Sequence, residues 1–258
     1  MNDATSAPVV SEATVPTADG PMRVIIACPP AGGPFPAVIT YPHIGGLTNT
    51  MRIMARRVAA GGFLCVVVDL YHRLGTIVID PESTDKDIVA ISRIAATSVT
   101  EAGAMTDTQS LIAWLDSHPE VRGPCYATVG YGRGGALAVQ AASHFPDRIR
   151  AAASILGFGF TAKGEQAARE SLARIQARLY FAFAEHDEII PRTVRDELAP
   201  LLRELNLDAR LVIHPGTRHP YVFPDRTVHD AAAASRDWRT VFAMFTESLA
   251  GSRDGEEN

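Results

Sequence analysis

Strand and helix patterns alternate along almost the whole chain, and this alternation constrains the fold more than any other feature. Short apolar runs typical of buried strands are followed by longer amphipathic or alanine-rich segments typical of helices. Strands separated by helices pair in parallel, because each crossover helix returns the chain to the same edge of the sheet. The sequence therefore predicts an α/β fold, with a mostly parallel central sheet and helices on both faces.

The expected elements follow from these patterns. Two extended runs at 11–15 and 22–27 flank the turn signal Ala18-Asp19-Gly20 and predict an opening β-hairpin. Further strands are expected at 37–41, 64–68, 125–129, 151–156, 179–184 and 209–213. Helices are expected at 48–60, 101–117, 136–145, 193–205 and 231–249, and the segment 74–100 is irregular at first and then helical.

The length of 258 residues suits one α/β domain, which we expect at 11–250 between flexible tails at 1–10 and 251–258. The formal net charge of -5 argues against nucleic acid and anionic membranes as partners. No apolar run reaches the length of a membrane span, and the first residues lack the pattern of a signal peptide. The three cysteines, Cys28, Cys65 and Cys125, lie far apart and indicate buried free thiols in a reducing compartment. We expect a cytoplasmic monomer or homodimer that acts on a small molecule, with no cofactor and no metal.

A glycine-rich turn at Gly130–Gly135 joins a strand pattern to a helix pattern, and this order has two common meanings. One is a phosphate loop, whose glycines let backbone N–H groups approach an anion. Such a loop normally belongs to the first strand–helix unit of a chain and has an acidic partner about 20 residues on, at the end of the next strand. Here the turn lies in mid-chain without that partner, which disfavours a nucleotide site.

The other meaning is a nucleophile elbow, in which a sharp turn exposes one side chain between two glycines. In the spacing G-x-Nu-x-G, Gly130 and Gly134 are the flanking glycines and Gly132 stands where the nucleophile belongs. Glycine at that position retains the turn and relaxes its backbone strain. It also removes the attacking atom.

The order of a catalytic triad continues downstream of the turn. In α/β-hydrolases the acid and then the histidine follow the nucleophile along the chain. Asp187 comes just after the expected strand at 179–184, and His219 comes after the strand at 209–213. A capping role for Asp187 and an inert loop position for His219 are the structural alternatives.

With these motifs in place, the chain resembles the dienelactone hydrolase family over most of its length. The resemblance depends on stretches that are specific only together, in this order: 41–47 (YPHIGGL), 69–73 (DLYHR), the turn at 130–135, 187–191 (DEIIP), 215–219 (PGTRH) and the closing helix.

The resemblance implies a role for several residues. Asp187 would be the triad acid and His219 the triad base, while the backbone N–H groups of Ile44 and Arg133 would form the oxyanion hole. Arg73 would hold a carboxylate-bearing substrate, or alternatively form a surface ion pair. Tyr71 and Tyr131 are assigned to the substrate site as well, although packing is the alternative for Tyr131.

The chain departs from the family at two positions. The family has cysteine or serine where Gly132 stands, and an acidic residue where His43 stands. Both positions belong to the expected catalytic site, which favours altered chemistry over random decay. His43 is therefore a third catalytic candidate, for proton transfer or substrate orientation; lining the entrance is its structural alternative.

Two functional hypotheses follow. In the first, His219, oriented by Asp187, acts as a general base on water or on the substrate, without a covalent intermediate. Hydrolysis of an ester or lactone fits this chemistry, as does a lyase or isomerase step through an enolate. In the second, the protein is a catalytically dead pseudoenzyme that binds a carboxylate ligand near Arg73.

Overall fold

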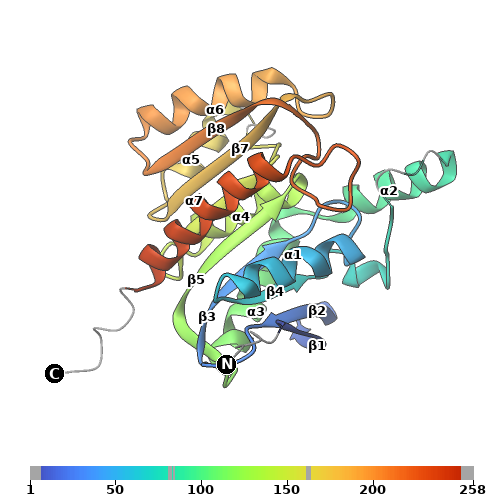
Figure 1. Cartoon of the computed structure of the whole chain (residues 1–258), viewed down its shortest axis with the longest axis vertical. Helices are drawn as coiled ribbons and strands as arrows, with labels where there is room; N and C mark the ends of the chain where they lie inside the picture. The colour runs from blue at the N-terminus through green and yellow to red at the C-terminus, as the bar shows by residue number, and fades with distance from the viewer. Residues whose placement is uncertain (1–6, 81–82, 84, 161–163, 251–258) are drawn as a thin grey trace, which may run out of the picture. The chain divides into compact units, whose positions relative to one another are not determined.

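A computed structural model of the chain describes residues 7–80, 83, 85–160 and 164–250 (Figure 1). The chain forms two compact units, Met1–Pro124 and Cys125–Asn258. The expected single domain at 11–250 stays a prediction, and the expected tail at 251–258 lies outside the described residues, as do residues 1–6. The boundary of the expected N-terminal tail at 1–10 is wrong, because Val9 and Val10 already pair with the second strand.

The strands of the first unit follow the order β1-β2-β4-β3. Strands β1 (Val9–Thr17) and β2 (Gly20–Cys28) form the expected antiparallel hairpin, longer than the sequence pattern indicates. Strand β4 (Leu64–Val68) pairs antiparallel with β2 and parallel with β3 (Phe35–Tyr41). Every residue of β4 is buried, as expected for a continuous apolar run.

Helix α1 (Asn49–Ala60) packs on β2 and β4 through a stripe of buried side chains that includes Met51, Met54 and Val58. The side chain of Thr48 caps the helix by accepting a hydrogen bond from the backbone N–H of Met51. The 3-10 turn η1 (His72–Leu74) and helix α3 (Glu101–Asp116) complete the ordered elements around these strands.

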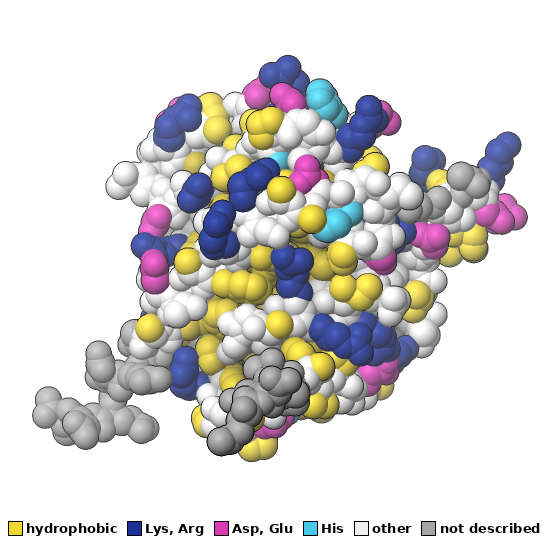
Figure 2. Space-filling model, in the orientation of Figure 1, with side chains coloured by type: hydrophobic (Ala, Val, Ile, Leu, Met, Phe, Trp, Pro, Cys, Tyr) yellow, Lys and Arg dark blue, Asp and Glu magenta, His cyan; other side chains and the backbone are white. Residues whose placement is uncertain are grey.

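Helix α2 (Lys86–Ser98) forms in the segment whose sequence is irregular at first and then helical. It carries exposed hydrophobic side chains, Ile88, Ile91 and Ile94, of which Ile94 is 69% exposed. Figure 2 shows charged side chains and hydrophobic ones together over this helix. Among the described residues, no helix combines the length and the apolar character needed to cross a bilayer.

The strands of the second unit follow the order β5-β6-β7-β8, and each neighbouring pair is parallel. Their bounds are Val121–Tyr131, Ile149–Ile155, Arg178–His186 and Ala209–Arg218, so β5 begins just before the second unit. The parallel registers place the carboxyl ends of all four strands at one edge of the sheet, where ligands of α/β proteins commonly bind.

Helices α4 (Arg133–His144) and α7 (Ala231–Ala250) both pack on β6, with α7 in front of the strands and α4 behind them in Figure 1. Helix α6 (Arg192–Glu204) matches the expected helix at 193–205. The short helix α5 (Glu165–Leu172), which packs on α4, has no counterpart among the sequence-based expectations. All three cysteines are free thiols, but only Cys65 is buried; Cys28 and Cys125 are half-buried, so for these two the expected burial is wrong.

Candidate active site

The turn between β5 and α4 is as sharp as the predicted nucleophile elbow, and Gly132 stands at its centre. Gly132 is the only residue between strand and helix, and its φ of 56° and ψ of -122° lie where L side chains are strained. Its N–H donates to the carbonyl of Ile155 at the end of β6 (3.1 Å), and its own carbonyl accepts from the N–H of Gly135 (2.9 Å). The sharp turn is therefore retained, and the glycine carries it without strain.

The glycines around position 132 differ in how much room they have. A Cβ on Gly130 would overlap the carbonyl oxygen of Gly134, and a Cβ on Gly135 would lie 2.5 Å from Ser154 Oγ. Among the residues that the structure describes, a Cβ on Gly132 would meet one atom within 4 Å, Phe158 Cε1 at 3.7 Å. Close packing thus requires glycine at the first two positions, whereas space alone does not require it at position 132.

Asp187 and His219 form a hydrogen-bonded pair, with His219 Nδ1 and Asp187 Oδ2 2.9 Å apart. Asp187 directly follows β7 and His219 directly follows β8. The second carboxylate oxygen of Asp187 accepts the backbone N–H groups of Ile189 (2.9 Å) and Ile190 (2.8 Å). The Asp187 side chain is only 4% exposed and that of His219 is 16% exposed, so the acid is enclosed while solvent reaches the ring.

The surroundings of Asp187 favour its charged form. Burial raises the pKa of the Asp187 carboxyl, but the hydrogen bond and charge of His219 and the two backbone N–H groups lower it more. The resulting pKa lies below the ordinary value of 3.8, so Asp187 is a carboxylate at neutral pH. A carboxylate here orients the His219 ring and stabilises it when it takes up a proton.

The segment that carries His219 reaches the elbow. Phe223, four residues after His219, packs its ring against that of Tyr131, the residue before Gly132, with centroids 5.2 Å apart. Gly132, Asp187 and His219 also directly follow the carboxyl ends of three strands that run in parallel. Tyr131 is 1% exposed, so packing against Phe223 is its evident role, and its contact with substrate stays a prediction.

Phe158 is a site residue that the sequence analysis did not identify. Its ring faces the space beside Gly132, and it lies in the loop after β6, where Leu156 adopts a φ of 55°. A non-glycine residue with positive φ is uncommon and often marks a functional loop. The glycines at 157 and 159 hint at an unusual backbone here, but nothing in the sequence ties Phe158 to Gly132.

Of the candidates in the first unit, His43 uses both ring nitrogens within its own loop. Its Nδ1 accepts the N–H of Gly45 (2.9 Å), which leaves the proton on Nε2, 3.3 Å from the Thr48 hydroxyl. Tyr71 donates its hydroxyl to the carbonyl of Ile44 (2.7 Å) and is 1% exposed. The catalytic role of His43, the oxyanion role of the Ile44 N–H and the substrate contact of Tyr71 all stay predictions.

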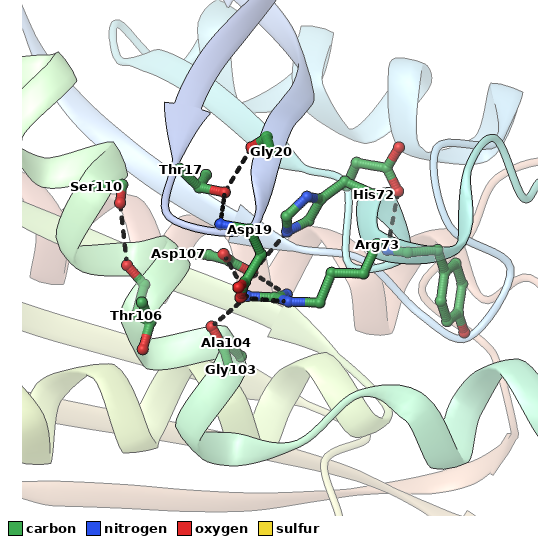
Figure 3. A network of polar contacts seen from close by, with 12 residues as sticks. Thr17, Asp19, Gly20, His72, Arg73, Gly103, Ala104, Thr106, Asp107 and Ser110 are labelled. Atoms are coloured by element: carbon green, nitrogen blue, oxygen red, sulfur yellow. Dashed lines mark hydrogen bonds and ion pairs between the residues drawn. The ribbon is translucent and has the colours of Figure 1, made fainter.

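Arg73 is held by carboxylates of the chain itself (Figure 3). Its two terminal nitrogens donate to both oxygens of Asp107, at 2.7 and 2.8 Å, and its Nε donates to Asp19 at 2.8 Å. The same Asp107 carboxylate lies 3.1 Å from His72 Nε2. These contacts support the alternative of an ion pair within the chain's own surface, since the Arg73 side chain is 30% exposed, and its contact with a substrate carboxylate stays a prediction.

Comparison with known proteins finds relatives over most of the chain. The sequence model described as the dienelactone hydrolase family matches residues 22–249. A relative from Synechocystis sp., provisionally named carboxymethylenebutenolidase, is 24% identical over 209 residues, which cover 80% of this chain and 83% of the relative. An Escherichia coli K12 protein with the same provisional name is 23% identical and covers 89% of this chain and 79% of its own length.

Solved structures show the same fold. A provisionally named dienelactone hydrolase from Klebsiella pneumoniae superposes with a TM-score of 0.81 at 23% identity, covering 94% of this chain and all of the other. A dienelactone hydrolase-like promiscuous phosphotriesterase from metagenomic libraries has a TM-score of 0.75 at 21% identity and covers 94% of this chain and 99% of its own. These neighbours establish the α/β-hydrolase fold that the sequence predicts.

Proposed function

Because this chain belongs to the dienelactone hydrolase family and is a hydrolase-type enzyme, we propose that it cleaves its substrate with an Asp187–His219 general base and no covalent nucleophile. The observation that carries the proposal is the 2.9 Å hydrogen bond between these two side chains, in a chain whose elbow position is Gly132. The chain thus retains the proposed base and the acid that would orient it, while the attacking side chain is missing.

The hydrogen bond selects which ring nitrogen does the chemistry. Asp187 accepts the proton of His219 Nδ1, so Nε2 is the nitrogen that can take up another proton. A water molecule in the space beside Gly132 would give its proton to Nε2 while its oxygen bonds to the substrate carbonyl carbon. The carbon–oxygen bond of the leaving alkoxide then breaks, and that oxygen takes the proton back from His219. Water, rather than a side chain, supplies the atom that is added.

General base catalysis contributes about 10²–10⁴-fold to a reaction rate, and an oxyanion hole adds a further factor. Arg133 is the first residue of α4, directly after the elbow, and its N–H is the proposed oxyanion donor from this turn. These terms suffice for an activated substrate, such as an ester or lactone with a good leaving group. We therefore propose a small ester, lactone or related carbonyl compound as substrate.

We further propose that the substrate carries a carboxylate, which Arg73 would bind. Comparing hydrolysis of p-nitrophenyl acetate with that of a p-nitrophenyl ester carrying a free carboxylate tests this point. A lower KM for the charged ester, lost in Arg73→Met, supports the contact. Equal KM values for the two esters leave Arg73 with its ion pairs alone.

The absence of a covalent intermediate is tested by intact mass spectrometry during turnover of p-nitrophenyl acetate. We expect no acyl adduct at 132 in the natural chain, and an acyl adduct there in Gly132→Cys, located by peptide mapping because the chain has three other cysteines. Gly132→Ala is the matched control, since it has the same backbone strain without a thiol. An adduct on any residue of the natural chain that forms as fast as turnover contradicts the proposal.

Turnover and ligand binding of a His219→Ala variant separate the enzyme from a catalytically dead binding protein. Turnover that His219→Ala abolishes supports the enzyme. Saturable ligand binding that survives His219→Ala, with no turnover of ester or lactone, supports the pseudoenzyme. A product formed without uptake of ¹⁸O from labelled water indicates a lyase or isomerase step in place of hydrolysis.

A further inference from the structure

A second carboxylate of the second unit, that of Asp237 on α7, is completely buried and is bonded by three side chains. Its Oδ1 accepts the hydroxyl of Tyr180 (2.7 Å) and lies 2.5 Å from His214 Nε2, and its Oδ2 accepts the hydroxyl of Tyr221 (2.6 Å). A buried carboxylate is costly unless such donors satisfy it. This cluster of four side chains, which we call the Asp237 cluster, is outside the proposed chemistry.

Both phenols of the Asp237 cluster stay protonated and therefore remain donors. Burial, followed by the charge of Asp237, raises the pKa of Tyr180 and of Tyr221 well above the ordinary value of 10.0. The rings of His214 and Tyr221 also pack edge to face, with centroids 5.2 Å apart. The cluster therefore combines hydrogen bonds and ring packing in one buried unit.

The partners of Asp237 come from three different segments. Tyr180 lies in β7, His214 lies in β8, and Tyr221 lies two residues after His219. Helix α7 is thereby bonded to the segment that bears the proposed catalytic base, through Tyr221. Tyr180 and His214 are bonded to the same carboxylate, but both lie within strands and outside the turn that contains His219.

Tyr221 closes the turn that contains His219. Its N–H donates to the carbonyl of Arg218 (2.7 Å), so His219 is the second residue of a four-residue turn. The carbonyl of Tyr221 accepts the N–H of Asp230 (3.0 Å) and lies 2.8 Å from His229 Nδ1. With its hydroxyl on Asp237, Tyr221 has every polar group bonded, and its side chain is 0% exposed.

We propose that Asp237 is a positioning residue, which holds the His219 turn through the hydroxyl of Tyr221 so that the imidazole meets Asp187 in one geometry. The inference rests on the proposed function, since it concerns the same base. Asp187 fixes the ring of His219 by one hydrogen bond, and the hydrogen bond from Tyr221 to Asp237 fixes the backbone from which the ring projects. Catalytic groups need such support, because a displacement of about 1 Å can cost 100-fold in rate.

The test compares Tyr221→Phe with Tyr180→Phe. Each variant removes one buried hydroxyl that donates to Asp237, so both lose a similar contact, but only Tyr221 belongs to the His219 turn. We expect Tyr221→Phe to lower kcat for p-nitrophenyl acetate about tenfold with little change in KM, while Tyr180→Phe retains the natural kcat. We also expect the acid limb of the pH profile of kcat to shift in Tyr221→Phe and to stay unchanged in Tyr180→Phe.

A second readout does not depend on activity. The ¹⁵N NMR signals of the His219 ring report its hydrogen bond to Asp187, and we expect them to move or broaden in Tyr221→Phe but not in Tyr180→Phe. If Tyr221→Phe does not fold, His229→Ala loosens the same turn from the carbonyl of Tyr221, and we expect the same NMR change from it.

Equal effects of the two tyrosine variants, or an unchanged His219 signal in Tyr221→Phe, overturn the positioning role. The failure of the proposed function looks different. In that case the natural chain turns over neither esters nor lactones, while the NMR comparison still decides whether Tyr221 positions the ring.

Discussion

Two histidine–aspartate pairs of the chain have almost the same length and different surroundings. His219 and Asp187 lie 2.9 Å apart, and His72 and Asp107 lie 3.1 Å apart. The His219 side chain is 16% exposed and that of His72 only 1% exposed. The Asp107 carboxylate also accepts hydrogen bonds from both terminal nitrogens of Arg73, so its negative charge is shared between His72 and this cation.

If His219 is the general base, as proposed, the difference means that a short distance between an imidazole and a carboxylate is not enough to define one. The other donors to Asp187 are neutral backbone N–H groups, so the carboxylate charge is directed to His219. A general base must also be accessible, and solvent reaches the ring of His219 but hardly that of His72. The next four experiments test this contrast.

The largest effect is expected from replacing the two histidines by asparagine. His219→Asn removes the base, and we expect kcat/KM for p-nitrophenyl acetate to fall about 10³-fold. His72→Asn removes a buried ring outside the proposed chemistry, and we expect near-natural kcat/KM at a temperature where it is folded. Steady-state kinetics on both variants checks this, and a similar loss in the two removes the distinction.

The carboxylates should differ in the same direction. In Asp187→Asn the ring of His219 loses its orienting charge, and we expect kcat to fall about 100-fold while circular dichroism is unchanged. Asp107→Asn alters only the His72–Arg73 network, and we expect its kcat to be close to natural. A large loss of kcat in folded Asp107→Asn assigns that network to the active site after all.

For the free energy of unfolding, we expect the larger loss in Asp107→Asn rather than in Asp187→Asn. Asp107→Asn leaves His72 and Arg73 with a neutral partner, and we expect it to cost about 2 kcal/mol of unfolding free energy. This is less than for a fully buried ion pair, because the Arg73 side chain is 30% exposed and solvent screens its charge. Urea denaturation of both aspartate variants measures the difference, and we expect the smaller loss in Asp187→Asn.

The smallest effect is expected on the stability of the fold at acidic pH. The pKa of Asp187 is lower in the folded chain than its ordinary value of 3.8, so its carboxylate stabilises the fold above that value. That contribution is lost as the pH falls below about 4 and passes through the folded pKa. We expect the acid-induced loss of stability to be slightly smaller in Asp187→Asn than in the natural chain. Equal pH dependence of the two unfolding curves shows that Asp187 has no lowered pKa.

The alternation of patterns was sufficient to predict the fold, but boundaries depended on packing that a local pattern does not contain. Helix α4 begins at Arg133, three residues before the expected start at Ala136. Glycine disfavours helices, so Gly134 and Gly135 argue locally for a longer turn. The close packing of this turn against Gly130 and Ser154 explains why glycine nevertheless stands in the first turn of the helix.

The pairing of Asp187 with His219 could be predicted because the two residues follow strand ends in a recognisable order. Asp237, Tyr180 and Tyr221 form a buried cluster from separate segments, and no spacing in the sequence connects them. Arg73 shows the reverse case, since its motif suggests a ligand contact and only coordinates reveal that Asp107 and Asp19 already engage it. Long-range partners are what a single sequence leaves open.

The room around Gly132 has an evolutionary consequence. A glycine codon that ends in a pyrimidine becomes a serine or cysteine codon by one base substitution, and the space beside this position accepts either side chain with only Phe158 nearby. A serine or cysteine at Gly130 would collide with the carbonyl oxygen of Gly134, so Gly130 cannot be replaced in the same way. Covalent catalysis and the proposed water-based catalysis are thus one base substitution apart at this turn, so a lineage could pass between them without rebuilding its scaffold.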